Sequence, residues 1–93
     1  MVDKIKRHVY LSGKVQGVGF RAFIRKKANE LGVKGWVKNL YDGRVEAVFV
    51  GEAEDVETMI EFVKEGPRFA NVNNIRVLEE DYEGRFDSFE IKF

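Results

Sequence analysis

The chain has 93 residues, is 44% hydrophobic and contains eight phenylalanines, which suits a single domain over residues 1–93 and leaves no room for a second. It has no cysteine and only one histidine, which excludes disulfides, thiolate nucleophiles and metal sites built from these ligands. Sixteen basic and sixteen acidic residues cancel, so the chain has little long-range attraction for nucleic acid or for an anionic membrane.

The first predicted elements are a strand and a helix separated by glycines. Apolar and polar residues alternate over residues 6–12, as in a half-buried strand, and His8 is expected to be an ordinary residue of that strand. A helix is predicted over residues 20–31, with Gly32 as its C-terminal cap. Its apolar residues recur at helical spacing: Phe20, Ile24, Ala28 and Leu31.

A hairpin and a second helix come next. Residues 34–40 and 44–50 are predicted as paired strands, because the Asp42-Gly43 pair between them is a strong hairpin signal. Residues 53–65 repeat the helical pattern, begin with acidic residues and stop at Gly66-Pro67.

Two further strands are predicted over residues 72–82 and 86–93, with a turn at Glu83-Gly84. The order of elements is therefore βαββαβ with an additional C-terminal strand. This order predicts an α+β, ferredoxin-like sandwich, in which an antiparallel sheet carries both helices on one face. Four phenylalanines are expected in its core: Phe20, Phe23, Phe49 and Phe62.

The segment Gly13–Arg21, called the glycine loop below, is the strongest local indication of a site. Glycines let backbone N–H groups converge, and the start of the following helix leaves its first amides unpaired beside a partial positive charge. Arg21, in the first turn of that helix, adds a planar set of donors that matches phosphate oxygens. The run therefore indicates a local anion site, although a simple strand-to-helix loop would also need glycines.

Other chemistry has little support. The two serines, Ser12 and Ser88, do not lie in a G-x-S-x-G turn, so covalent acyl transfer is not expected. The N-terminus is too charged for a secretory signal and no apolar stretch is long enough to cross a membrane, so a cytoplasmic protein is expected. Charged residues make up 34% of the chain, against about a quarter in average proteins, an excess common in proteins of thermophiles.

Two segments together resemble the acylphosphatase family. One is the glycine loop, and the other, whose Asn39 lies eighteen positions after Arg21, is Gly35-Trp36-Val37-Lys38-Asn39-Leu40-Tyr41-Asp42-Gly43. The resemblance extends over essentially the whole chain. It implies hydrolysis of acyl phosphates, such as acetyl or carbamoyl phosphate, to a carboxylate or carbamate and inorganic phosphate. It also implies that Arg21 binds the phosphoryl group and that Asn39 orients the attacking water. Tyr41 departs from the family, because many relatives have proline there.

The expected site uses no metal and no cofactor. The amides of five residues would surround the phosphoryl oxygens, while Arg21 would do the work that magnesium does in other phosphoryl-transfer enzymes. These five are Gln16, Gly17, Val18, Gly19 and Phe20. The expected partners are a small acyl phosphate and inorganic phosphate, without nucleic acid or membrane, and the protein is expected to be a monomer.

Two alternatives come from other classes. Acylphosphatase-like modules also occur in larger carbamoyl-transferring proteins, so the chain could be a detached or non-catalytic binding module of that kind. RNA-recognition modules share the predicted fold, and Gly17-Val18-Gly19-Phe20-Arg21-Ala22-Phe23 faintly echoes their aromatic signature. Those modules carry their stacking aromatics on strands, whereas Phe20 and Phe23 fall at a loop end and on a helix. The neutral charge also gives RNA binding poor support.

Overall fold

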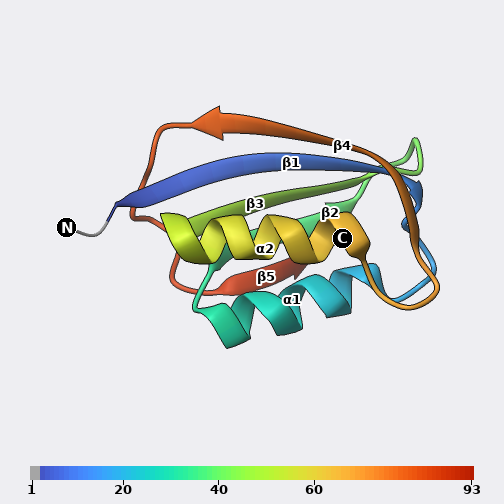
Figure 1. Ribbon diagram of the computed structural model, residues 1–93, viewed down its shortest axis with the longest axis horizontal. Coiled ribbons are helices and arrows are strands. Elements are labelled where there is room, and N and C mark those ends of the chain that lie inside the picture. The colour runs from blue at the N-terminus through green and yellow to red at the C-terminus, as the bar shows by residue number, and fades with distance from the viewer. Residues whose placement is uncertain (1–2) are drawn as a thin grey trace.

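A computed structural model describes residues 3–93 of the chain. Five strands form one sheet in the order β4-β1-β3-β2-β5, and both helices cover the same face of it (Figure 1). Helix α1 packs over β2 and β5, whereas α2 packs over β1, β3 and β4. The elements are, in chain order, β1 (Lys4–Lys14), α1 (Phe20–Leu31), β2 (Lys34–Asn39), β3 (Val45–Glu52), α2 (Ala53–Glu65), β4 (Asn71–Glu80) and β5 (Phe89–Lys92).

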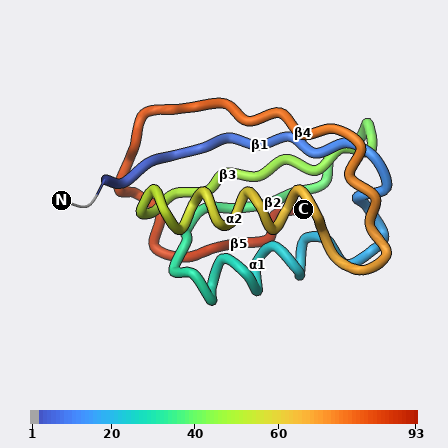
Figure 2. The backbone as a smooth tube through the Cα atoms, in the orientation of Figure 1, coloured from blue at the N-terminus to red at the C-terminus, as the bar shows by residue number. Residues whose placement is uncertain are grey.

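The predicted ferredoxin-like arrangement with an extra C-terminal strand is confirmed, but the sheet is mixed rather than wholly antiparallel. Strand β5 runs parallel to β2, with Gly35 opposite Phe89 and Lys38 opposite Lys92. The reason lies in the path of the chain, which Figure 2 traces from β4 at one edge of the sheet to β5 at the other. The chain reverses direction after β4, so β5 runs the same way as β1 and β2. The last strand is also shorter than the predicted 86–93.

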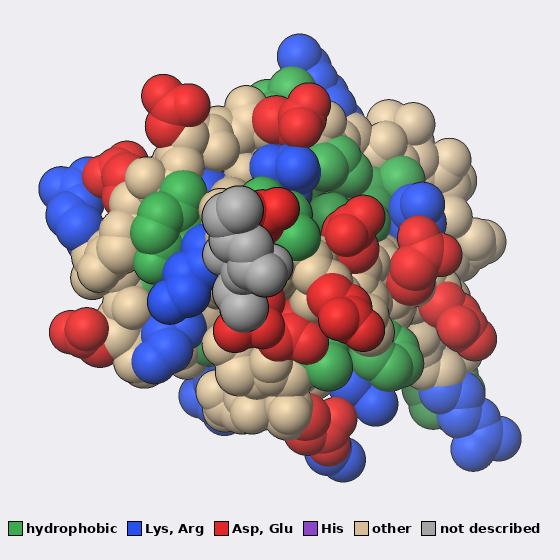
Figure 3. Space-filling model, turned by 60° about the vertical axis from the view of Figure 1, so that its left-hand side comes forward, with side chains coloured by type: hydrophobic (Ala, Val, Ile, Leu, Met, Phe, Trp, Pro, Cys, Tyr) green, Lys and Arg blue, Asp and Glu red, His purple; other side chains and the backbone are tan. Residues whose placement is uncertain are grey.

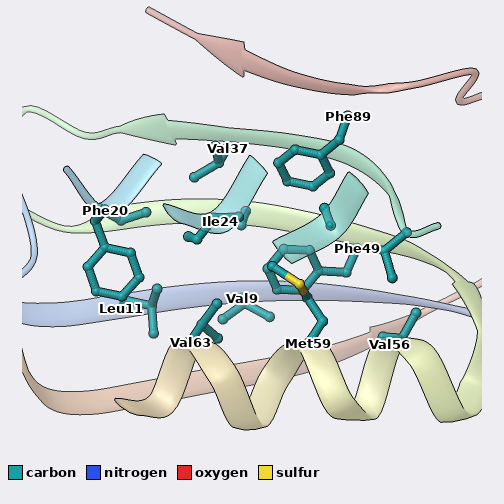
Figure 4. Close-up of a cluster of buried hydrophobic side chains, with 14 of the residues drawn as sticks. Val9, Leu11, Phe20, Ile24, Val37, Phe49, Val56, Met59, Val63 and Phe89 are labelled. Carbon is teal, nitrogen blue, oxygen red and sulfur yellow. The ribbon is translucent and has the colours of Figure 1, made fainter. Parts of the chain in front are cut away.

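The core lies between the sheet and the two helices (Figure 4). Alternation along the strands places Val9, Leu11 and Phe49 on the covered face, where they meet Ile24 of α1 and Met59 of α2. All five side chains are completely buried. Burial of one such apolar side chain stabilises the fold by about 1.5–3 kcal/mol, so this layer is the main source of stability.

The prediction of four core phenylalanines is correct for two of them. Phe20 and Phe49 are buried, and Phe23 packs against the edge of the core with its ring perpendicular to that of Phe20. Phe62 is only half-buried and lies beneath the Lys27 ammonium, 4.5 Å from its ring centre. The buried stripe of α2 runs through Val56, Met59 and Val63, so Phe62 lies at the side of the helix, next to Lys27 of α1, and not on the face that meets the sheet.

Among residues 3–93 no helix covers the other face of the sheet, where the side chains of the strands themselves pack together. His8 lies between two carboxylates, with Nε2 2.6 Å from Glu46 and Nδ1 2.9 Å from Glu80. Its ring stacks on Tyr10 and meets the edge of Trp36. The sheet therefore carries aromatic residues on its strands, in addition to the loop and helix phenylalanines considered in the comparison with RNA-recognition modules.

Basic side chains lie over two of the aromatic rings on this face of the sheet, those of Tyr10 and Trp36. Arg44 lies 5.0 Å from the ring centre of Tyr10, and Lys38 and Lys92 lie 5.5 Å and 4.8 Å from that of Trp36. Acidic groups lie beside the cations, as in the Lys38–Glu46 pair at 3.7 Å. Acidic and basic side chains are also interspersed on the face seen in Figure 3. This mixing agrees with a net charge of zero.

The raised pKa of Tyr10 predicts how the free energy of unfolding changes at alkaline pH. Burial and the hydrogen bond that its hydroxyl donates to Glu46, 3.1 Å long, raise the pKa of Tyr10 above its ordinary value. The folded state therefore holds this proton more tightly than the unfolded chain does. The resulting stability is present below about pH 10 and is lost as the pH rises through the folded pKa.

We expect the free energy of unfolding to fall more steeply above about pH 10 in the wild type than in Tyr10→Phe, which cannot ionise there. Urea unfolding curves from about pH 8 to about pH 12 would measure both slopes. Tyr41→Phe is the matched control, because Tyr41 is fully exposed and should leave the slope unchanged. Equal slopes for the wild type and Tyr10→Phe would contradict the prediction.

Candidate active site

The glycine loop leaves β1 and leads directly into α1. Gly17 and Gly19 have φ angles of 73° and 75°, which lie in the left-handed region that side chains with a Cβ avoid. A Cβ added at either position would meet no atom within 4 Å, so the backbone conformation and not crowding requires glycine there. The loop can thus turn sharply twice and keep open space beside its backbone.

The amides at this turn lack backbone partners among residues 3–93. No side chain caps the N-terminus of α1, and its first turn carries no acidic residue. Within residues 3–93, the amides of residues 16–20 donate no hydrogen bond to another backbone group outside the helices and strands. A row of free N–H groups at the positive end of a helix is a site for an anion.

Arg21 places an uncompensated positive charge beside these amides. None of the ion pairs among residues 3–93 involves its guanidinium group. Instead, Nη1 donates a hydrogen bond of 3.3 Å to the Lys92 carbonyl, and the guanidinium carbon lies 4.9 Å from the centre of the Phe93 ring. These contacts orient the group without neutralising it, which leaves its charge available to an anionic ligand.

Asn39 brings an unsatisfied acceptor to the same place. It is the last residue of β2 and pairs with the core residue Val45, so its side chain lies on the face covered by the helices. Its Oδ1 is buried and has no hydrogen-bond donor within the described part of the chain. Buried side-chain oxygens in native proteins nearly always have a partner, so this oxygen is an acceptor that is free to receive a hydrogen bond from a ligand or a water molecule.

These groups line one cavity of about 230 Å³. Its walls include Gln16, Gly17, Gly19, Phe20, Arg21 and Asn39, so tertiary structure brings six of the seven predicted site residues together. Val18 does not line the cavity and instead packs against the core. Phe20 also lines the cavity, although it is only 2% exposed and its side chain belongs to the core.

Strand β5 and the residue that follows it supply two cavity residues that the sequence did not place at the site. Ile91 and Phe93 line the cavity opposite the loop. The alternation of residues 86–93 groups Phe93 with Phe89 and Ile91 on the core face, but Phe93 is fully exposed and lies against Arg21. No sequence signal relates Arg21 to Phe93, because the chain brings them together only after crossing from β4 to the opposite edge of the sheet.

A second cavity, of about 480 Å³, lies at the opposite ends of the strands. Its lining mixes Lys4, Lys34, Asp55 and Tyr82 and includes none of the predicted site residues. The smaller cavity is the better candidate for catalysis, because it alone of the two joins free amides, an unpaired cation and a buried acceptor. That combination can bind a tetrahedral oxyanion and hold a water molecule beside it.

Comparison with known proteins defines the class to which this fold and site belong. The family model for acylphosphatase matches residues 7–91. The chain belongs to the acylphosphatase family, and it is an enzyme that hydrolyses acyl phosphates.

Individual relatives support this assignment over nearly their whole lengths. The chain is 49% identical over 92 residues to an acylphosphatase of Syntrophobacter fumaroxidans, covering 99% of this chain and 95% of the relative. It is 53% identical over 88 residues to an acylphosphatase of Haloarcula marismortui, covering 95% and 96% of the two chains.

Solved structures show the same fold. Acylphosphatase from Bacillus subtilis superposes with a TM-score of 0.92 at 36% identity, covering 96% of this chain and 99% of that one. Full-length HypF, in its phosphate- and nucleotide-bound form, gives a TM-score of 0.87 at 28% identity. That match covers 100% of this chain but only 12% of HypF. The same fold therefore also occurs as a small part of a larger protein.

Proposed function

We propose that Arg21, the amides of residues 16–20 and Asn39 form the catalytic site for the hydrolysis of acyl phosphates. One observation carries this proposal. A single cavity joins an uncompensated guanidinium group, the unpaired amides at the start of α1 and the buried, unpartnered Oδ1 of Asn39. No other group of residues in the described part of the chain combines the three.

The loop and Arg21 would bind the phosphoryl group. The converging amides would donate hydrogen bonds to its oxygens, and the planar guanidinium would bind two of them together. The contacts of Arg21 with Lys92 and Phe93 support this role, because they hold the group in place before substrate arrives. Negative charge on the equatorial oxygens would thereby be stabilised during transfer.

Asn39 would hold the attacking water. Its Oδ1 would accept a hydrogen bond from that water and keep the water oxygen in line with phosphorus. The water oxygen then forms a bond to phosphorus while the bond between phosphorus and the acyl oxygen breaks. The carboxylate leaves with that electron pair and needs no proton, so no general acid is required. A phosphate oxygen of the substrate accepts the proton of the attacking water.

This mechanism predicts that hydrolysis does not depend on a metal. Among residues 3–93, no group of three or more histidine, aspartate and glutamate side chains could hold a metal ion. We expect the rate of acetyl phosphate hydrolysis to be unchanged by chelator and not increased by added magnesium. The rate without enzyme must be subtracted under each condition, because acyl phosphates also hydrolyse spontaneously. Loss of activity in chelator that magnesium restores would contradict the proposal.

The chain's setting in the cell stays a prediction. No helix within residues 3–93 has the length and apolar character needed to cross a membrane. One hydrophobic core joins both helices to the sheet, which supports a single domain.

We propose a monomer that acts in the cytoplasm on small acyl phosphates without binding nucleic acid. Size-exclusion chromatography, and binding to a mixed RNA pool at low salt, would test the monomer and the absence of RNA binding.

A further inference from the structure

The side chain of Gln16 connects the glycine loop to the β2–β3 turn. Its Nε2 donates two hydrogen bonds, one of 2.8 Å to the Leu40 carbonyl and one of 2.9 Å to the Arg44 carbonyl. Both partners are backbone oxygens, which only accept, so the group between them must be the amide nitrogen. The side chain therefore acts on the protein itself, while its backbone N–H belongs to the anion site.

The two carbonyls close the end of the hairpin that carries Asn39. The Leu40 amide donates to the Arg44 carbonyl over 2.8 Å, and the Gly43 amide donates to the Leu40 carbonyl over 3.2 Å. Asn39 immediately precedes this closed turn. Gln16 thus binds Leu40 and Arg44, the residue pair directly after the pair Asn39–Val45 in the hairpin.

Sheet pairing alone does not position the loop against β2. The pairing of β1 with β3 ends at Leu11 and Val45, and Val45 also pairs with Asn39. Residues 15–19 lie beyond β1, so no ladder hydrogen bond ties them to β2. The two hydrogen bonds of Gln16 make this connection directly, across 24 and 28 residues of sequence.

We propose that Gln16 is a positioning residue, whose side chain sets the distance between the glycine loop and Asn39. This inference rests on the proposed function. The loop and Arg21 would place the phosphorus, and Asn39 would place the water, so the link between them sets the alignment of the attack. In-line attack is sensitive to small displacements, and an error of about 1 Å can cost about a hundredfold in rate.

The test is Gln16→Met, which keeps the length of the side chain and its backbone N–H but removes both donated hydrogen bonds. We expect kcat to fall by about tenfold to a hundredfold, while the inhibition constant of inorganic phosphate changes by less than about twofold. Gln16→Asn, which is too short to reach both carbonyls, is a second variant should methionine impair folding. Phosphate titration of each variant counts the folded sites.

A double-mutant cycle separates positioning from a general structural role. In an Asn39→Ala background the side chain of Gln16 has no water-binding group to position, so Gln16→Met should lower kcat by less than about twofold further. An equal loss in both backgrounds, or an unchanged kcat in folded Gln16→Met, would overturn the inference. If Asn39→Ala itself retains full activity, the proposed function fails and this inference fails with it.

Asp42→Ala is the matched control for loosening of the hairpin. Asp42 accepts hydrogen bonds from the Arg44 amide and from its guanidinium, 3.1 Å and 2.8 Å long, at the exposed tip of the same turn. It does not contact the glycine loop through any hydrogen bond of the described residues. We expect its kcat to match the wild type. A loss equal to that of Gln16→Met would attribute the effect to the turn as a whole and overturn the assignment.

Discussion

Replacing Arg21 by alanine is expected to lower kcat/KM for acetyl phosphate by at least about a thousandfold. Removing one preorganised donor at an anionic transition state costs about 2.7–4 kcal/mol, or about a hundredfold to a thousandfold in rate. Arg21 would supply two donors together with a charge that no acidic side chain among residues 3–93 compensates. Inorganic phosphate should also bind much more weakly to the variant.

Arg21→Lys should fail almost as severely, since an ammonium group cannot reproduce a planar, two-pronged contact. It would also lose the arrangement in which the guanidinium lies over the Phe93 ring. Arg25→Ala is the matched control, because Arg25 is exposed one turn later on the same helix and outside the cavity. Steady-state kinetics on folded protein would decide the matter. Normal turnover by Arg21→Lys would remove Arg21 from its assigned role.

Asn39→Ala is expected to reduce kcat by about a hundredfold to a thousandfold while inorganic phosphate still binds competitively. The two effects should separate because the phosphoryl group contacts the loop and Arg21, whereas Asn39 holds only the water. The variant should remain folded, because the deleted oxygen has no donor in the described structure and its loss breaks no internal hydrogen bond. Its unfolding free energy should fall by less than about 1 kcal/mol.

Asn74→Ala provides the comparison for Asn39, since Asn74 is an exposed strand asparagine on β4 and lies outside the cavity. Phosphate inhibition, kcat and urea unfolding should be measured on both variants. A folded Asn39→Ala protein that no longer binds phosphate would place Asn39 in ligand binding instead of water orientation.

Local patterns in the sequence predicted most elements well. The first helix covers residues 20–31 as expected and ends at Gly32, whose amide donates to the Ala28 carbonyl. The second covers residues 53–65 and stops at Gly66. Such features depend on helical spacing and on glycine at the helix ends, which short stretches of sequence contain. The hairpin at Asp42-Gly43 also formed as predicted, but β2 ends one residue earlier than expected and β3 covers Val45–Glu52 instead of residues 44–50.

Elements that depend on distant partners were predicted less well. The first strand extends over residues 4–14 rather than 6–12, because its pairing with both β3 and β4 continues past the alternating segment. The parallel pairing of β5 with β2 has no local sequence signal. Phe62 and Phe93 satisfy the apolar patterns of their segments yet stay outside the core, because burial depends on what the fold places above each side chain.

The sequence by itself determined the class of fold, the family and the candidate site residues, because periodicity, glycine positions and the two motifs are local properties of the chain. Only the tertiary structure decided how those residues meet. It placed Arg21 against Lys92, 71 positions away, and joined Gln16 to the turn beyond Asn39. It also buried the unpartnered oxygen of Asn39. These contacts arise from sheet order and from helix packing, which residues far apart in the chain establish together.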